Sequence, residues 1–203
     1  MKNNETSDKK ARRLIEEKGG IIRTAEALQS GIHPRTLYYL RDTGILEQIS
    51  RGVYRLAEQE PISNLDFVTV AMRFPKAVIC LVSALSYHEI TSQVPHAVSI
   101  AIAKGAETPR IDSPPLFVHR FSGKSLISGV EEIVVDGVAV RIYSPEKTLA
   151  DCFKFRNKIG MDVVLEALRL YKSRKSFNLE ALLKYAEICR IEKIMKPYLE
   201  AMV

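Results

Sequence analysis

The order of short segments in the first 57 residues is the feature that most constrains the fold of this chain. Apolar residues recur there at intervals of three and four positions, the spacing of one helical face, and glycines follow each stretch. The three predicted helices cover residues 8–18, 25–28 and 34–42. Thr24 is expected to cap the second helix through its side chain, and Pro34 suits the first position of the third.

Two short strands are predicted to follow the third helix. Residues 46–50 and 53–56 favour strands, and only Arg51 and Gly52 separate them. A two-residue connection that contains glycine is a hairpin signal. Three helices followed by a hairpin is the element order of a winged helix-turn-helix, so we expect that DNA-binding domain over residues 1–60.

A polar segment without periodicity, residues 58–61, indicates a domain boundary. Residues 61–203 then alternate predicted strands and helices, and they end in a series of helical stripes. Ser83 and Ser144 are each expected to cap a helix in this region. The predicted fold class is therefore α+β, with an N-terminal winged helix-turn-helix followed by a mixed α/β domain and a C-terminal helical cluster.

The third predicted helix carries the candidate DNA-binding face. On a helical wheel Leu37 and Leu40 define the buried side, and Arg35, Tyr38 and Tyr39 fall on the opposite side. Arginine can pair with guanine through two hydrogen bonds, and tyrosine can donate to phosphates. With residues next to the predicted second helix and at the hairpin tip, the candidate DNA-binding set is Arg23, Thr24, Arg35, Thr36, Tyr38, Tyr39 and Arg51.

The charge of the chain favours a polyanionic partner. The formal net charge is +6, and residues 9–56 contain ten Lys or Arg against five Asp or Glu. Such an excess supplies the electrostatic attraction that binding to double-stranded DNA needs. Solvated charges on a small helical domain that contacts proteins would give the same count, so this alternative stays open.

The predicted C-terminal helices are basic as well. They indicate a second surface for a polyanion, formed by Lys147, Lys154, Arg156, Lys158, Arg174 and Lys175. Cations at helix ends also complement the helix dipole, which is an explanation without any ligand.

Sequence motifs for catalysis or metal binding are missing. The chain has no Gly-rich phosphate loop, no nucleophile elbow and no metal-ligand spacing among Cys80, Cys152 and Cys189. An apolar neighbour beside each cysteine favours buried, reduced thiols. We therefore expect no catalytic residue, no metal and no other cofactor. The N-terminus is polar, and the sequence has no apolar run of about 18 residues. We therefore expect a cytoplasmic protein without a membrane partner.

Four blocks of sequence carry a family resemblance: residues 19–37, 44–55, 83–91 and 144–151. In this order and spacing they resemble the AbiEi family, the antitoxins of type IV toxin–antitoxin systems. The resemblance implies a repressor that binds inverted repeats in the double-stranded DNA of its own operator. It also implies opposition to a nucleotidyltransferase toxin without a stable complex. Thr148, Asp151 and Lys154 fall in the predicted helix that begins with the last of these blocks. With the basic C-terminal residues named above, they are candidates for an antitoxin surface.

Two further function classes stay open. A ligand-responsive winged-helix transcriptional regulator without a toxin partner would bind a small molecule in its mixed domain. An enzyme, such as a transferase that acts on the toxin, would need a convergent acid–base pair in a cleft. No such pair is evident from the spacing of the four histidines and their neighbours.

Overall fold

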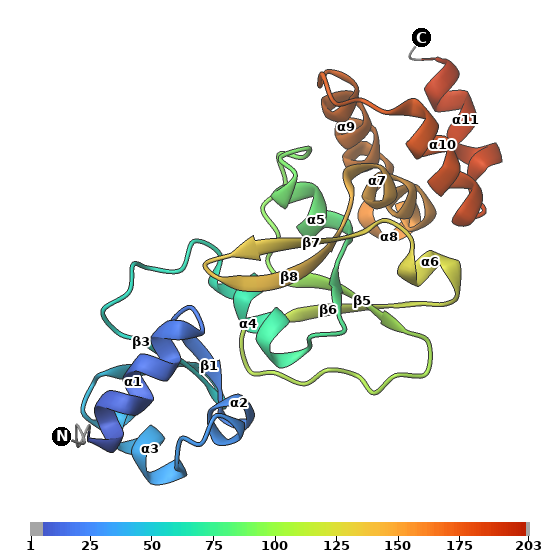
Figure 1. Ribbon diagram of the computed structural model, residues 1–203. Helices are drawn as coiled ribbons and strands as arrows, with labels where there is room; N and C mark the ends of the chain where they lie inside the picture. The colour runs from blue at the N-terminus through green and yellow to red at the C-terminus, as the bar shows by residue number, and fades with distance from the viewer. Residues whose placement is uncertain (1–5, 202–203) are drawn as a thin grey trace. The chain divides into compact units, whose positions relative to one another are not determined.

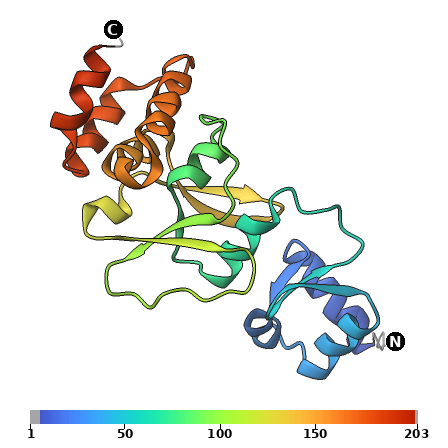
Figure 2. The ribbon, with the colours of Figure 1, turned by 180° about the vertical axis from the view of Figure 1, so that it is seen from behind.

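The computed structural model describes residues 6–201, which form two compact units (Figures 1 and 2). The first unit contains the described residues up to Pro75 together with Val134–Val140. The second unit contains Lys76–Ile133 and the described residues from Arg141 onward. The first unit is thus larger than the predicted domain of residues 1–60, since a helix and the tip of a later hairpin belong to it.

The first unit begins with three helices and three strands. They are α1 (Ser7–Glu17), β1 (Ile21–Arg23), α2 (Thr24–Gln29), α3 (Pro34–Asp42), β2 (Leu46–Ser50) and β3 (Val53–Leu56). The strands form an antiparallel sheet in the order β1-β3-β2. The three predicted helices and the predicted hairpin are confirmed, and β1 adds a third strand to the sheet. Helix α4 (Leu65–Arg73) also belongs to this unit.

Apolar stripes of the three helices close a small core over this sheet. Ile15 of α1 and Leu37 and Leu40 of α3 are fully buried, and they share one cluster with Ile22 of β1 and Leu46 of β2. The spacing of three and four positions predicted these inward faces. Burial of one side of α3 leaves the other side of that helix toward solvent.

The second unit is built around a mixed sheet. Its remaining elements are β4 (Val78–Ile79), α5 (Leu81–Tyr87), β5 (Val98–Ala103), β6 (Leu116–Phe121), α6 (Lys124–Ile127), β7 (Val130–Val135), β8 (Val138–Tyr143), α7 (Pro145–Lys154), α8 (Arg156–Ile159), α9 (Met161–Lys172), α10 (Leu179–Ile188) and α11 (Glu192–Glu200). The strand order is β6-β5-β4-β8-β7, with β5 parallel to β6 and β4 parallel to β8. The tip of the β7–β8 hairpin is the part that belongs to the first unit.

Helix α7 is the centre of the C-terminal helical cluster. It packs against α5, α9 and α10, and seven of its residues are buried. Ser144 caps it by accepting a hydrogen bond from the amide of Lys147, and Pro145 takes its first position, as the sequence predicts. The expected cap at Ser83 is wrong. Ser83 lies inside α5, where its hydroxyl joins the carbonyl of Ala97 to the amide of Ser99.

The mixed α+β class and the C-terminal helical cluster are confirmed by these elements. Cys80, Cys152 and Cys189 are free and buried. Among residues 6–201, no helix is both long enough and apolar enough to span a bilayer.

Candidate nucleic-acid interface

The outer face of α3 carries polar and aromatic side chains. Arg35 is exposed and Thr36 half-buried, and Tyr38 and Tyr39 keep 44% and 52% of their surface accessible. Leu37 lies on the opposite, buried side, as the helical wheel predicts. Two aromatic hydroxyls and a guanidinium thus lie on one helix face. These groups can donate hydrogen bonds to phosphates and base edges.

The N-terminus of α3 is held by a side chain that the sequence analysis did not identify. The Nδ1 atom of His33 accepts a hydrogen bond from the amide of Arg35 at 3.2 Å. This bond satisfies one of the free amides at the helix start, while Pro34 has no amide to satisfy. The first turn, which carries Arg35, is therefore fixed in place.

Arg41 contacts Tyr38 and Asp42, two exposed residues of α3. Its guanidinium lies 5.2 Å from the centroid of the Tyr38 ring and 2.7 Å from the carboxylate of Asp42. The ion pair with Asp42 holds the guanidinium of Arg41, and the contact with this guanidinium restricts the ring of Tyr38.

The hairpin turn is tied to the start of α2. The amide of Thr24 donates to the carbonyl of Gly52 at 2.9 Å, and the Thr24 hydroxyl donates to the same oxygen at 3.3 Å. The predicted cap at Thr24 is therefore wrong, because α2 begins at Thr24 and its hydroxyl serves the turn. From the other side, Arg73 of α4 donates to the carbonyl of Arg51. The side chain of Arg51 is therefore exposed, while the backbone of its turn is held by hydrogen bonds on both sides.

Arg23 is already engaged by an ion pair. Its guanidinium lies 2.7 Å from the Glu26 carboxylate, which also accepts from the Arg23 amide at 3.1 Å. The hydrogen bond from Arg23 lowers the pKa of Glu26 below its ordinary value. Because this charge is paired and half-buried, Arg23 offers less to a phosphate than Arg35 does. Its role as a DNA contact stays a prediction.

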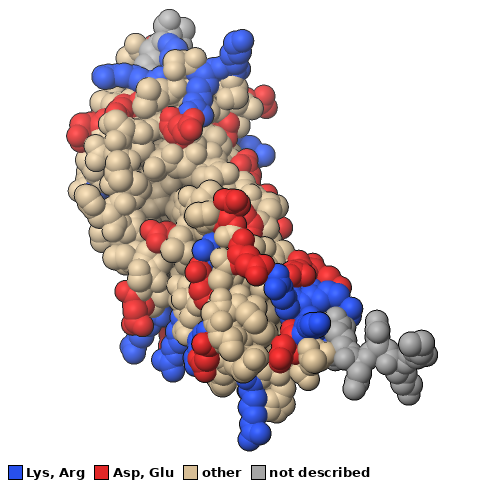
Figure 3. Space-filling model, turned by 90° about the vertical axis from the view of Figure 1, so that its left-hand side faces the viewer, with Lys and Arg blue, Asp and Glu red and all other residues tan. Residues whose placement is uncertain are grey.

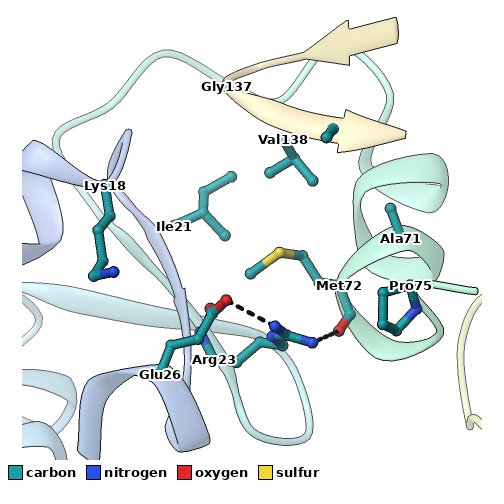
Figure 4. Close-up of a pocket in the computed structure, with 10 residues that line it drawn as sticks. Lys18, Ile21, Arg23, Glu26, Ala71, Met72, Pro75, Gly137 and Val138 are labelled. Carbon is teal, nitrogen blue, oxygen red and sulfur yellow. Dashed lines mark hydrogen bonds and ion pairs between the residues drawn. The ribbon is translucent and has the colours of Figure 1, made fainter. Parts of the chain in front are cut away.

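A cavity of about 350 Å³ lies beside this ion pair (Figure 4). Its walls come from the first unit. The lining residues are Lys18, Ile21, Arg23, Glu26, Ala71, Met72, Pro75, Gly137, Val138 and Ala139. The cavity is therefore lined by two cations, one carboxylate and several apolar side chains.

Charges elsewhere in the first unit are largely mixed. Figure 3 shows one face on which basic and acidic side chains lie next to one another in the lower part of the view. Arg12 of α1, for example, pairs with both Glu16 and Glu58. The cations of α1 are thus partly neutralised, whereas Arg35 and Arg51 are exposed at the two elements predicted to meet DNA.

The predicted second basic surface needs a correction at Lys147. This residue is fully buried and forms an ion pair with Asp151, which is fully buried as well. Its ammonium group lies 4.1 Å from the ring centroid of Tyr143 and 5.1 Å from that of Phe121. Lys147 therefore stabilises the core of the second unit and is not part of an exposed surface.

Two candidates that rested on the family resemblance are also buried. The Thr148 hydroxyl donates to the carbonyl of Tyr143, and Asp151 accepts from the thiol of Cys189 at 3.2 Å. Burial raises the pKa of the Asp151 carboxyl, and burial together with this neighbour raises the pKa of the Cys189 thiol to about 12. Neither Thr148 nor Asp151 can contribute to a surface in this structure.

The remaining predicted cations are accessible to different degrees. Lys154, Lys158 and Lys175 are exposed. Arg156 and Arg174 are half-buried, and each donates to a backbone carbonyl. Lys154 ends α7, and Arg156 and Lys158 lie on α8. Arg174 and Lys175 lie in the turn between α9 and α10.

The segment that carries α1–α3 and the hairpin matches a known protein family. Residues 9–57 match the family described as "Transcriptional regulator, AbiEi antitoxin". The AbiEi match confirms the resemblance over the blocks at residues 19–37 and 44–55, and it covers Arg23, Arg35 and Arg51. The blocks at residues 83–91 and 144–151 lie outside it. The match spans most of α1, all of α2 and α3, and both strands of the hairpin.

Solved structures show the same fold beyond the AbiEi segment. The crystal structure of the RV2827C protein from Mycobacterium tuberculosis is similar with a TM-score of 0.52. The two sequences are 13% identical, and the similarity covers 94% of this chain and 79% of that one. No curated protein matches this chain.

Proposed function

We propose that this chain is a DNA-binding transcriptional autorepressor and an antitoxin of a type IV toxin–antitoxin system. The N-terminal helices and hairpin act as a winged helix-turn-helix on double-stranded operator DNA with inverted repeats. Arg35 reads base edges, while Tyr38, Tyr39 and Thr36 contact the backbone. Arg51 at the hairpin turn reaches the neighbouring backbone or minor groove.

The observation that carries this proposal is the orientation of α3. Leu37 and Leu40 anchor the helix in the core, so Arg35 and both tyrosines point outward from a fixed position. The AbiEi match falls on the same residues and supports a regulator. In addition, hydrogen bonds to Arg51 and Gly52 fix the turn that bears the wing arginine.

The antitoxin half of the proposal rests on the AbiEi match alone. The partner is a nucleotidyltransferase toxin that this chain counteracts without a stable complex. Lys154, Lys158 and Lys175 are the exposed candidates for such a role in the second unit, after Lys147 is removed from the set.

A reporter experiment with a separation-of-function variant tests both halves. The promoter of the chain's own operon drives a reporter, and the adjacent toxin gene is induced in a parallel strain. Arg35→Ala is expected to release the promoter and still protect against the toxin. Arg169→Ala removes an exposed arginine from α9 and serves as the matched control, with repression intact. Full repression by Arg35→Ala would contradict the regulator half, and failure of the wild-type chain to protect would contradict the antitoxin half.

The cavity beside Arg23 favours a second candidate, a ligand-responsive regulator without a toxin partner. Within residues 6–201, Nε of Arg23 is shielded from solvent and has no hydrogen-bond partner. Lys18 and the apolar walls suit a small carboxylate with an apolar body, and this cavity lies in the first unit rather than in the mixed domain that the sequence favours for a ligand. Thermal unfolding of the wild-type chain with a panel of such acids tests it. A rise in melting temperature that disappears in Met72→Trp, which fills the cavity, would support this candidate.

A further inference from the structure

A row of aromatic rings follows one face of β6, which lies at an edge of the five-stranded sheet. Alternate residues of a strand share a face, so Phe117, His119 and Phe121 belong to the same side of β6. Phe121 is buried and His119 is half-buried, whereas Phe117 keeps 60% of its surface exposed. The row therefore leads from the core of the second unit to solvent.

Phe155, which precedes α8, adds a fourth ring to the row. Its ring centroid lies 5.4 Å from that of His119 in an edge-on arrangement and 5.6 Å from that of Phe121. Phe155 also packs against the core cluster of the second unit. These contacts fix the inner rings, and Phe117 remains as a large apolar side chain that folding leaves accessible.

Lysines border the row of rings. The ammonium group of Lys154 lies 5.8 Å from the centroid of Phe121, and that of Lys158 lies 5.9 Å from the centroid of Phe155. Burial, and then the charge of Lys158, lower the pKa of His119. The segments that supply these side chains, residues 116–124 and 154–160, contain no Asp or Glu. The local charge beside the rings is therefore positive.

We propose that this aromatic–lysine surface, formed by Phe117, His119, Phe155, Lys154 and Lys158, binds single-stranded RNA. Proteins that bind unpaired strands combine rings on which bases stack with cations that follow the phosphates. A duplex hides its base faces, so an exposed Phe117 selects unpaired nucleotides. The neutral ring of His119 can hydrogen-bond a 2′-hydroxyl, which distinguishes RNA from DNA. The surface lies in the second unit and does not depend on operator binding by the first.

A single fluorophore tests the stacking directly. The chain contains no tryptophan, so Phe117→Trp introduces one indole at the proposed site. The full-length variant is titrated with an unstructured RNA of about 12 nucleotides, which is within the range of known stacking sites. Saturable quenching of the indole is expected with RNA, and weaker quenching with DNA of the same sequence. No quenching by RNA would overturn the proposal, and equal binding of the DNA would overturn the assignment to RNA.

Affinity measurements separate this surface from the N-terminal one. Phe117→Leu keeps an apolar side chain without a ring, so RNA affinity is expected to fall about five- to hundredfold. Phe117→Tyr keeps the ring and is expected to restore binding. Lys158→Ala is expected to weaken RNA binding, whereas Lys193→Ala, at an exposed position of α11, leaves it unchanged.

Duplex DNA provides the internal control for these variants. Phe117→Leu is expected to bind the promoter duplex as the wild type does, so the RNA proposal and the operator proposal can fail separately. If RNA affinity falls in Arg35→Ala but not in Phe117→Leu, the N-terminal unit holds the RNA and the proposal is wrong. Stronger quenching by a polyglutamate peptide than by RNA would assign the surface to an acidic protein partner and would also overturn it.

Discussion

The hydroxyl of Thr24 and the carbonyl of Gly52 lie 3.3 Å apart and join the start of α2 to the turn between β2 and β3. The turn needs a glycine there, since Gly52 has a φ of +73°. A Cβ atom at this position would also lie 3.3 Å from the Thr24 hydroxyl oxygen. Placement of the Arg51 side chain therefore depends on a backbone that other residues adopt only with strain.

Gly52→Ala is expected to destabilise the chain by about 1–2 kcal/mol, because the left-handed conformation is costly for alanine. Chemical denaturation followed by circular dichroism measures the free energy of unfolding. Gly44→Ala is the matched control, because Gly44 has a φ of +75° and open space around the missing Cβ. If Gly52→Ala lowers the free energy of unfolding by less than Gly44→Ala does, the role given to the Thr24 contact is contradicted.

The buried pair of Lys147 and Asp151 makes a second prediction. Lys147→Ala leaves the Asp151 carboxylate buried without its cation, so a loss of about 3–5 kcal/mol in the free energy of unfolding is expected. The double variant Lys147→Met/Asp151→Leu removes both charges and is expected to lose less than the single variant. Lys196→Ala, which breaks an exposed pair with Glu200, is expected to change stability by about 0.5 kcal/mol or less. Equal losses in the single and double variants would contradict a buried ion pair.

Local arrangements in this chain are predictable from its sequence. The stripe of Leu37 and Leu40 on α3 and the Arg51-Gly52 turn are set by neighbours within a few residues, and the structure has both. Ser144 and Pro145 likewise start α7 as predicted. These features follow from helical periodicity and from turn and cap preferences, which act over single turns of chain.

Contacts between distant segments could not be predicted in this way. Thr24 is 28 residues from Gly52, so the sequence around Thr24 predicts only a local cap for its hydroxyl. Lys147 and Asp151 have the i,i+4 spacing of ion pairs that usually lie on helix surfaces. Their burial is produced by packing of α7 against α5, α9 and α10, which no short window of sequence contains. The row of rings on β6 was missed for the same reason, because Phe155 joins it from a different element.

Histidine titration makes a third prediction, for the pH dependence of stability. Burial lowers the pKa of His88, whose Nε2 lies 2.7 Å from the carbonyl of Tyr143, and burial also lowers that of His119. The folded state therefore binds protons less readily than the unfolded chain. Its stability is expected to fall as the pH drops below the ordinary histidine value of about 6.5.

Unfolding free energies measured between about pH 7.5 and about pH 5.5 test this expectation. His88→Gln can still donate to the Tyr143 carbonyl but does not titrate, so its stability is expected to depend less steeply on pH. His96→Gln is the control, because His96 is exposed in the loop between α5 and β5. A pH dependence that is unchanged in His88→Gln would contradict the titration of this residue in the folded chain.

The central claim, that α3 reads DNA, is tested most directly by measuring how tightly duplex DNA binds. Fluorescence anisotropy across a salt series gives this affinity for the full-length wild type and for Arg35→Ala. For the duplex from the chain's own promoter, Arg35→Ala is expected to lose about 1–3 kcal/mol of binding free energy, and less for a random duplex. Wild-type affinity should fall steeply with salt, as phosphate contacts release counterions. Unchanged affinity of Arg35→Ala for the promoter duplex would contradict the assignment of α3 as the helix that reads DNA.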